Sequence, residues 1–308
     1  MIMANITANK DFVVYNIKAN DNVSCASFVP ELGGVVSSLQ LPGVDGEREL
    51  LHQHDFFWQC DNDDLAGGMP FLFPVCARLS RNNQDGVYSY QGQHYKLPIH
   101  GFSWQLPWDV VEHGDDFIVM QLESNASTLK QYPFDFCIQL RYEIRNGQLF
   151  CYQSYENRSG EAMPYYAGFH PYFSAASKDN IEIDYEPIER WQYNSALTDL
   201  VGRKANFSLP TKLANPDLNE QLTKVGENKT VNMIYENSDI LQVEAQGLED
   251  HDLFPFIQLY TIVDKNFFCI EPWMGYPNAM NAVKGVRWLQ PNQQEHGLLR
   301  IELKSEAE

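Results

Sequence analysis

The chain has 308 residues, of which 44% are hydrophobic and 20% are charged, and its formal net charge is -19 at pH 7. This hydrophobic fraction excludes an intrinsically disordered chain and is sufficient for a large core. Because so negative a surface repels phosphate backbones and anionic lipid, neither a nucleic acid nor a membrane is expected as a partner.

Short runs of β-branched and aromatic residues alternate with turn signals from one end of the chain to the other. This pattern predicts strands at residues 12–17, 24–29, 35–41, 117–123, 136–144, 148–155, 181–185, 240–244, 256–263, 267–271 and 298–303.

The clearest pair of predicted strands is 136–144 and 148–155. Apolar residues occupy every second position of the first strand, and Asn146-Gly147 separates it from the second. Asn-Gly is the strongest short-range hairpin signal, because both residues tolerate a positive φ. Residues 264–266, Asp-Lys-Asn, predict another hairpin turn.

Helical periodicity is weak. Residues 127–132 and 215–225 are each expected to form one or two helical turns. Residues 202–238 are the most polar and irregular stretch and are expected to be a surface excursion. No linker or internal repeat marks a boundary, so one domain over residues 1–308 is predicted. Strands without intervening helices favour an all-β fold, either a sandwich or a barrel.

Targeting and redox signals are also absent from the sequence. It shows no basic segment followed by an apolar one at its start, and no run of about 20 apolar residues. We therefore expect a cytoplasmic protein, either a monomer or a homodimer. No C-x-x-C pair occurs, so the six cysteines are expected to be reduced thiols. They are Cys25, Cys60, Cys76, Cys137, Cys151 and Cys269.

Motifs for common cofactors are missing. The sequence has no G-x-G-x-x-G, Walker A, H-E-x-x-H or G-x-S-x-G motif, so dinucleotide, nucleotide triphosphate, zincin and α/β-hydrolase chemistry lack their basic requirement. His52-Gln53-His54 has no distant partner of fitting spacing. Neither a metal site nor an organic cofactor is therefore predicted.

Four segments place a titratable side chain among apolar, glycine and proline residues. A buried charge is costly unless it is paired or used, so each is a candidate functional position. The same positions also fit a structural role, with hydrogen-bonded core histidines and an arginine–glutamate salt bridge. The segments are 67–78 with Arg78, 97–104 with His100, 168–173 with His170, and 269–278 with Glu271.

Together these segments resemble the galactose mutarotase-like superfamily, nearest to its bacterial aldose 1-epimerase-like branch. The Gly-Gly-x-Pro, Phe-Pro and Arg elements, then His-Gly-Phe, His-Pro-Tyr-Phe and Glu-Pro-Trp, occur in the family's order, and the resemblance spans about residues 12–303. It implies a large antiparallel β-sandwich (a supersandwich) with an open cleft. It also implies an isomerase, an aldose 1-epimerase, that acts on a sugar without a cofactor.

The resemblance further implies that His170 and Glu271 are the catalytic pair and that Arg78 and His100 bind the sugar. Glu271 suits the base that deprotonates the C1 hydroxyl, because apolar walls raise its basicity. His170 suits the acid, because imidazole titrates near neutral pH. Trp273 is expected to cover the C–H face of the sugar.

Two departures bear on the substrate. The related hexose-6-phosphate branch has an arginine where Trp104 stands, so an unphosphorylated sugar is favoured here. The family's sugar-binding aspartate has no secure match, and Asp217 and Asp239 are the candidates. The alternatives are a hexose-6-phosphate 1-epimerase, a non-catalytic carbohydrate-binding protein on the same fold, and a β-sandwich interaction protein.

Overall fold

The largest sheet of the computed structural model, which describes residues 5–9, 12–59 and 64–305, has nine antiparallel strands. Their spatial order is β11-β12-β13-β14-β28-β24-β23-β18-β21. Buried and half-buried side chains alternate strictly in β14 and β24, so one face of this sheet supplies core residues. The bounds are β11 (Asp109–His113), β12 (Phe117–Glu123), β13 (Phe136–Arg145), β14 (Gln148–Asn157), β18 (Glu182–Asp184), β21 (Thr211–Lys212), β23 (Val231–Ile234), β24 (Asp239–Gly247) and β28 (Gln294–Ser305).

Two further antiparallel sheets form the facing layer. One has the order β1-β2-β3-β4-β5, with β1 (Asn5–Asn9), β2 (Phe12–Lys18), β3 (Cys25–Val29), β4 (Val35–Gly43) and β5 (Gly46–Glu49). The other has the order β20-β19-β22-β25-β26-β16-β6, and β17 pairs with β26. Its strands are β6 (Phe71–Leu72), β16 (Gly168–Phe169), β17 (Tyr172–Ser174), β19 (Pro187–Tyr193), β20 (Leu200–Lys204), β22 (Gln221–Val225), β25 (Phe256–Tyr260) and β26 (Phe267–Trp273).

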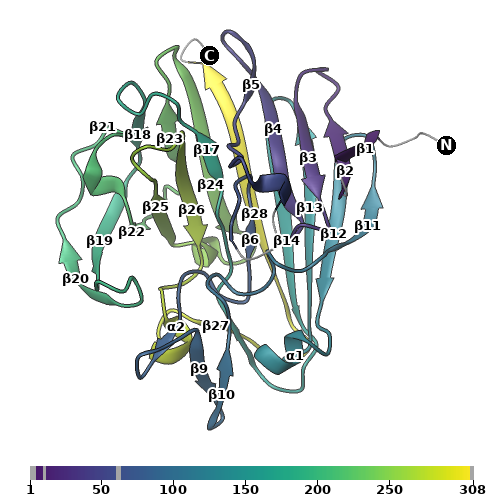
Figure 1. Cartoon of the computed structure of the whole chain (residues 1–308), viewed down its shortest axis with the longest axis vertical. Helices are drawn as coiled ribbons and strands as arrows, with labels where there is room; N and C mark the ends of the chain where they lie inside the picture. The colour runs from purple at the N-terminus through teal and green to yellow at the C-terminus, as the bar shows by residue number, and fades with distance from the viewer. Residues whose placement is uncertain (1–4, 10–11, 60–63, 306–308) are drawn as a thin grey trace.

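Contacts between the layers define the sandwich. Strand β2 lies against β12 and β13, β4 lies against β28, and β26 lies against β24 (Figure 1). The core between the layers is rich in fully buried aromatic side chains, among them Phe28, Phe73, Phe136 and Tyr142. The predicted all-β antiparallel sandwich is confirmed.

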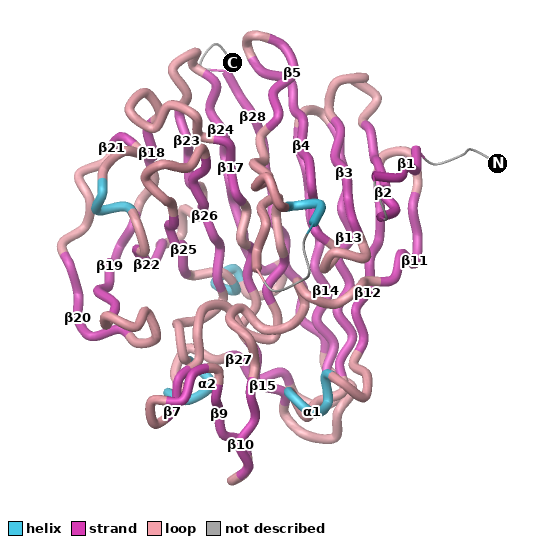
Figure 2. The backbone as a smooth tube through the Cα atoms, viewed as in Figure 1, coloured by secondary structure: helices cyan, strands magenta, loops and turns pink. Residues whose placement is uncertain are grey.

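The remaining elements are short, and helix is confined to single turns (Figure 2). No helix in the described ranges is long and apolar enough to cross a membrane. Cys60 lies outside these ranges, and the other five cysteines are free thiols. The elements are the pairs β7 (Ser80–Arg81) with β8 (Gln84–Asp85), β9 (Val87–Tyr90) with β10 (Gln93–Lys96) and β15 (Met163–Tyr165) with β27 (Arg287–Leu289), the helices α1 (Thr128–Gln131) and α2 (Ala279–Ala282), and the 3₁₀ turns η1 (Phe57–Gln59), η2 (Pro216–Leu218) and η3 (His251–Leu253).

The predicted hairpin at Asn146-Gly147 is confirmed. Arg145 pairs with Gln148 in the β13–β14 register, and the two turn residues have φ values of 52° and 72°. A positive φ at both positions matches the right-handed twist of the flanking strands. The hairpin therefore begins the nine-stranded sheet through purely local chemistry.

Two predictions for the polar stretch after Lys204 are wrong. Residues 215–225 form η2 and then strand β22 rather than a helix, and β22 lies inside the eight-stranded sheet rather than in a surface excursion. The reason is that its buried polar side chains find partners on neighbouring elements. Arg190 donates to Gln221 Oε1 at 2.8 Å, and the hydroxyls of Tyr185 and Thr223 lie 3.1 Å apart.

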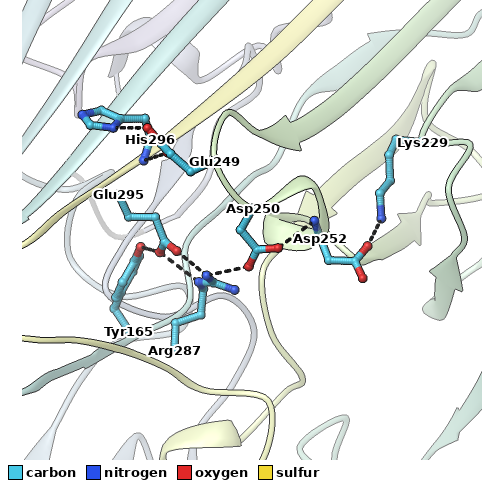
Figure 3. Close-up of polar contacts among 8 residues, drawn as sticks. All are labelled: Tyr165, Lys229, Glu249, Asp250, Asp252, Arg287, Glu295 and His296. Atoms are coloured by element: carbon cyan, nitrogen blue, oxygen red, sulfur yellow. Dashed lines mark hydrogen bonds and ion pairs between the residues drawn. The ribbon is translucent and has the colours of Figure 1, made fainter.

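A polar network fastens the short β27 strand to the end of the sandwich (Figure 3). Arg287 pairs with Glu295 of β28 and, at 3.0 Å, with Asp250 beside η3. Glu295 also accepts a hydrogen bond from the Tyr165 hydroxyl of β15. This network joins β15, β27 and β28, which lie far apart in the sequence.

Candidate active site

A cleft of about 180 Å³ opens beside strands β25 and β26. Gln258 and Tyr260 of β25 and Glu271 and Trp273 of β26 line it. Gln258 is directly opposite Glu271 in the strand register, so the two side chains share one face of the sheet. Loops carry Arg78, His100 and His170 to the same cleft. The structure thus brings together all five predicted site residues.

Glu271 and His170 meet in the cleft. His170 Nε2 lies 3.4 Å from Glu271 Oε1, and the side chains are 6% and 1% exposed. The backbone N–H of His170 donates to the Pro70 carbonyl, which fixes the loop between β16 and β17. His170 Nδ1 and Glu271 Oε2 are buried and form no hydrogen bond with any residue that the structure describes. Each side chain therefore keeps one atom ready for a ligand.

Burial acts on this pair in opposite directions. Desolvation raises the pKa of Glu271 well above its usual value, and the negative charge of Glu220 raises it further. Desolvation lowers the pKa of His170 to about 3. Both effects favour an uncharged pair, with a proton on the carboxyl group and a neutral imidazole.

The ring of His100 is held in one tautomer. The Ala77 N–H donates to His100 Nδ1 at 3.1 Å, so Nε2 carries the proton and donates toward a ligand. The backbone N–H of His100 donates in return to the Ala77 carbonyl, and both residues have a positive φ, of 62° and 65°. The next residue is Gly101 because its φ is 72° and a Cβ there would lie 2.2 Å from the Phe73 carbonyl oxygen.

Arg78 is exposed and lines the cleft. Its guanidinium forms no ion pair or hydrogen bond within the described part of the chain, so a structural salt bridge with Glu271 is not formed. The loop that carries it is fixed from behind by Asn278, whose backbone N–H donates to the Arg78 carbonyl at 3.1 Å. Arg78 is thus a positioned cation with free donors.

Glu220 is the cleft residue that the sequence did not reveal. Neither Asp217 nor Asp239 lines the cleft, because Asp217 is exposed beside Arg190 and Asp239 is buried in an ion pair with Arg48.

Glu220 does line it, with burial raising its pKa. Gln258 donates to its Oε2 at 3.1 Å and accepts from the Tyr193 hydroxyl at 2.9 Å. Since Glu220 directly precedes β22 with a φ of 51°, no local signal marks it as part of the site.

One set of possible metal ligands is present in the described ranges. Ligand atoms of His170, Cys269 and Glu271 lie within 4.8 Å of one another. His52 and His54, whose ring nitrogens are 3.4 Å apart, have no third ligand of this kind among the described residues.

Aromatic side chains form the apolar walls of the cleft. Trp273 is 2% exposed, and the ring of His170 stacks on Tyr172 with a centroid distance of 4.7 Å. Trp104 also lines the cleft and donates its indole N–H to the Ile99 carbonyl at 3.1 Å. Of the described residues that line the cleft, Arg78 is the one lysine or arginine.

Comparisons with known proteins agree with this site and fold. The family model described as aldose 1-epimerase matches residues 14–294. The plasmid form of protein LacX from Lactococcus lactis subsp. lactis is 22% identical over 271 residues, which cover 81% of this chain and 89% of LacX. A putative glucose-6-phosphate 1-epimerase from Salmonella typhimurium is 29% identical over 109 residues, which cover 32% of this chain and 31% of that protein.

Solved structures share the architecture. The Slr1438 protein from Synechocystis sp. PCC 6803 aligns with a TM-score of 0.83 and 24% identity, over 99% of this chain and 100% of that one. Galactose 1-epimerase from Lactobacillus acidophilus NCFM aligns with a TM-score of 0.75 and 13% identity, over 99% of both chains. The fold is therefore the galactose mutarotase-like sandwich. Because the family match spans nearly the whole sequence, this chain belongs to the aldose 1-epimerase family of isomerases.

Proposed function

We propose that the chain interconverts the α and β anomers of an unphosphorylated sugar by acid–base ring opening. The observation that carries this proposal is the buried His170–Glu271 pair, 3.4 Å apart, in a cleft that also presents Arg78, His100 and Glu220. A positioned acid and a positioned base are what this reaction requires, and each contributes on the order of 100- to 10,000-fold.

In the proposed mechanism, Glu271 removes the proton of the C1 hydroxyl while His170 donates a proton to the ring oxygen. The C1–O5 bond breaks, C1 becomes a carbonyl carbon, and rotation about C1–C2 presents its other face. Ring closure returns both protons and gives the other anomer. The uncharged pair that burial favours is the state of the side chains after opening.

A bound sugar supplies what the pair needs to become charged. The C1 hydroxyl donates to the Glu271 carboxylate, and the ring oxygen accepts from the His170 imidazolium. Hydrogen bonds to a charged form favour that form, so substrate binding moves the proton from the carboxyl group to the imidazole. The groups thereby gain their reactive state when the substrate is in place.

The remaining polar groups suit neutral hydroxyls. Arg78 and His100 Nε2 donate hydrogen bonds to hydroxyl oxygens, and Glu220 accepts one from a hydroxyl group. Trp273 covers the C–H face of the ring. The cleft is smaller than the roughly 300 Å³ at which clefts for drug-sized ligands begin, which fits one monosaccharide unit.

The second candidate substrate is a hexose 6-phosphate. The Salmonella relative named above and the free guanidinium of Arg78 favour it. The acidic residues Asp64, Glu220 and Glu271 line the same cleft and repel a phosphate dianion. The charge of the cleft therefore favours the neutral sugar.

Saturation-transfer NMR of anomer exchange tests both parts of the proposal. We expect faster exchange for glucose or galactose than for glucose 6-phosphate. Glu271→Gln should lower the exchange rate by about 100-fold or more, because the amide cannot take the proton. The control is Glu112→Gln, the same change on the edge strand β11. Wild-type protein that accelerates exchange of none of these sugars, or a Glu271→Gln variant within threefold of wild type, contradicts the proposal.

A further inference from the structure

Cys269 adds a third ligand to the His170–Glu271 pair. It precedes Glu271 by two residues in β26, so both side chains point to the same face of the sheet. All three side chains are buried, and one ligand atom of each lies within 4.8 Å of the other two. The proposed acid–base chemistry gives the thiol no part.

The spacing of the pair matches a tetrahedral metal site. Nitrogen and oxygen ligands at the usual distances from Zn²⁺, about 2.0–2.2 Å, lie roughly 3.4 Å from each other. His170 Nε2 and Glu271 Oε1 are 3.4 Å apart. A small rotation of the Cys269 side chain completes a three-ligand set of nitrogen, sulfur and oxygen atoms, with the fourth position facing the cleft.

The buried polar atoms and the local charge also point to a cation. His170 Nδ1 and Glu271 Oε2 are without a partner in the described structure, although both side chains are more than nine-tenths buried. Asp64 and Glu220 line the cleft above them and attract a cation toward it. Imidazole and thiolate together select a thiophilic metal rather than Mg²⁺ or Ca²⁺.

We propose that His170, Cys269 and Glu271 form an inhibitory site for a thiophilic divalent cation of the Zn²⁺ type. Binding releases the thiol proton to solvent and forms metal–sulfur, metal–nitrogen and metal–oxygen bonds. Because the metal occupies both proposed catalytic side chains, it competes with the sugar. The binding stands on the geometry alone, and the inhibition rests on the proposed function.

Cobalt and zinc titrations of the metal-stripped full-length protein test the binding. Co²⁺ should bind with one equivalent per chain and give the near-ultraviolet charge-transfer band of a cobalt thiolate. Cys269→Ala should abolish the band. It should also weaken Zn²⁺ binding, measured against a chromophoric chelator, by at least about 10-fold, since even loss of an outer-shell partner costs about that much. The matched control is Cys151→Ala, which removes another buried thiol, in β14.

Further measurements separate the alternatives. His52→Ala should leave Zn²⁺ affinity unchanged, and a sugar that the protein turns over should raise the apparent Kd for Zn²⁺. Melting temperatures identify any variant that fails to fold, and Cys269→Ser then replaces Cys269→Ala. Absence of a stoichiometric thiolate band, or a band that persists without Cys269, overturns the site. Zn²⁺ that binds through Cys269 without slowing anomer exchange overturns the inhibition. Protein that shows the band but no exchange contradicts the proposed function alone.

Discussion

His170 lies where a charged imidazole is costly in the absence of a hydrogen-bonding sugar. Its pKa is lowered to about 3 by burial, and Pro171 follows it and restricts the backbone of the loop. The proposed acid therefore becomes charged only as the reaction proceeds. A group of this kind acts mainly on the transition state rather than on substrate affinity.

His170→Asn should lower the anomer exchange rate by about 100-fold or more and leave sugar affinity within several-fold of wild type. The reason is that asparagine keeps a polar side chain but has no proton to deliver. Exchange rate, sugar Kd and melting temperature are measured on the same preparations. A loss of rate that only follows the folded fraction would identify His170 as a structural residue.

Glu220 acts on the same pair through its charge. Desolvation sets the high pKa of Glu271, and the Glu220 carboxylate adds to it because two negative charges in one cleft repel each other. The active pair must hold one proton between Glu271 and His170. It loses that proton as the pH rises through the Glu271 pKa.

Glu220→Gln should therefore shift the alkaline limb of the kcat/KM profile to lower pH. Removing the Glu220 charge stabilises the Glu271 carboxylate, so the pair gives up its proton sooner. The position of the limb is the readout, because the height of the profile also reflects lost sugar contacts. Glu112→Gln, with the same change in net charge, should leave the limb in place. An alkaline limb that does not move, or moves upward, counts against this coupling.

At the scale of elements, Asn278 connects the loop that carries Arg78 to helix α2. Its side chain accepts from the Ser80 N–H at 3.0 Å and donates to the Ser80 carbonyl and to Asp199 Oδ1, each at 2.9 Å. Its φ is 58°, which asparagine tolerates better than most residues. The position of Arg78 thus depends on a residue 200 positions later in the chain.

Asn278→Gly and Asn278→Ala should both destabilise the protein and raise KM for the sugar. Each removes the side-chain hydrogen bonds, worth about 1 kcal/mol apiece, and frees the Arg78 loop. Alanine should be the worse of the two by about 1 kcal/mol, because only glycine adopts this φ without strain. Calorimetry and steady-state exchange kinetics check both effects. Equal stability of the two variants would show that backbone strain is unimportant there.

The elements also show which parts of the fold the sequence predicts. Strands such as β13 and β14 are visible because each buries one face and their turn chemistry is local. Strand β22 is not, because the burial of Gln221 and Thr223 depends on partners from other strands. The four glycine- and proline-flanked segments predict the polar residues of the cleft, whereas Glu220 lies in a polar stretch that only the eight-stranded sheet brings to it.

At the scale of the whole molecule, stability depends on how so acidic a chain uses its few cations. Lys229 is a buried lysine, with a side chain only 1% exposed, and it pairs with Asp252 at 2.7 Å (Figure 3). The hydrogen bond from Lys229 lowers the pKa of Asp252. Stability from a lowered carboxyl pKa is present above the unfolded-state pKa and is lost as the pH falls through the folded-state pKa.

Asp252→Asn should lower the melting temperature at neutral pH by at least about 2 °C, because it leaves the buried ammonium group without its counter-charge. The difference from wild type should shrink as the pH falls below 4, where Asp252 itself becomes protonated. Glu227→Gln, the same charge change at an exposed site in the preceding loop, is the control. A difference that stays constant down to pH 3 would be inconsistent with this ion pair.

The central position of β28 in the nine-stranded sheet has a consequence during protein synthesis. This strand pairs with β14 on one side and β24 on the other, so each half of the sheet has an unpaired edge until residues 294–305 leave the ribosome. At about 5–20 residues per second, the edge of β14 waits on the order of ten seconds for its neighbour. An exposed edge strand invites pairing with other chains. The nascent chain is therefore expected to need protection by chaperones until translation is nearly complete, and only then to close its sheet.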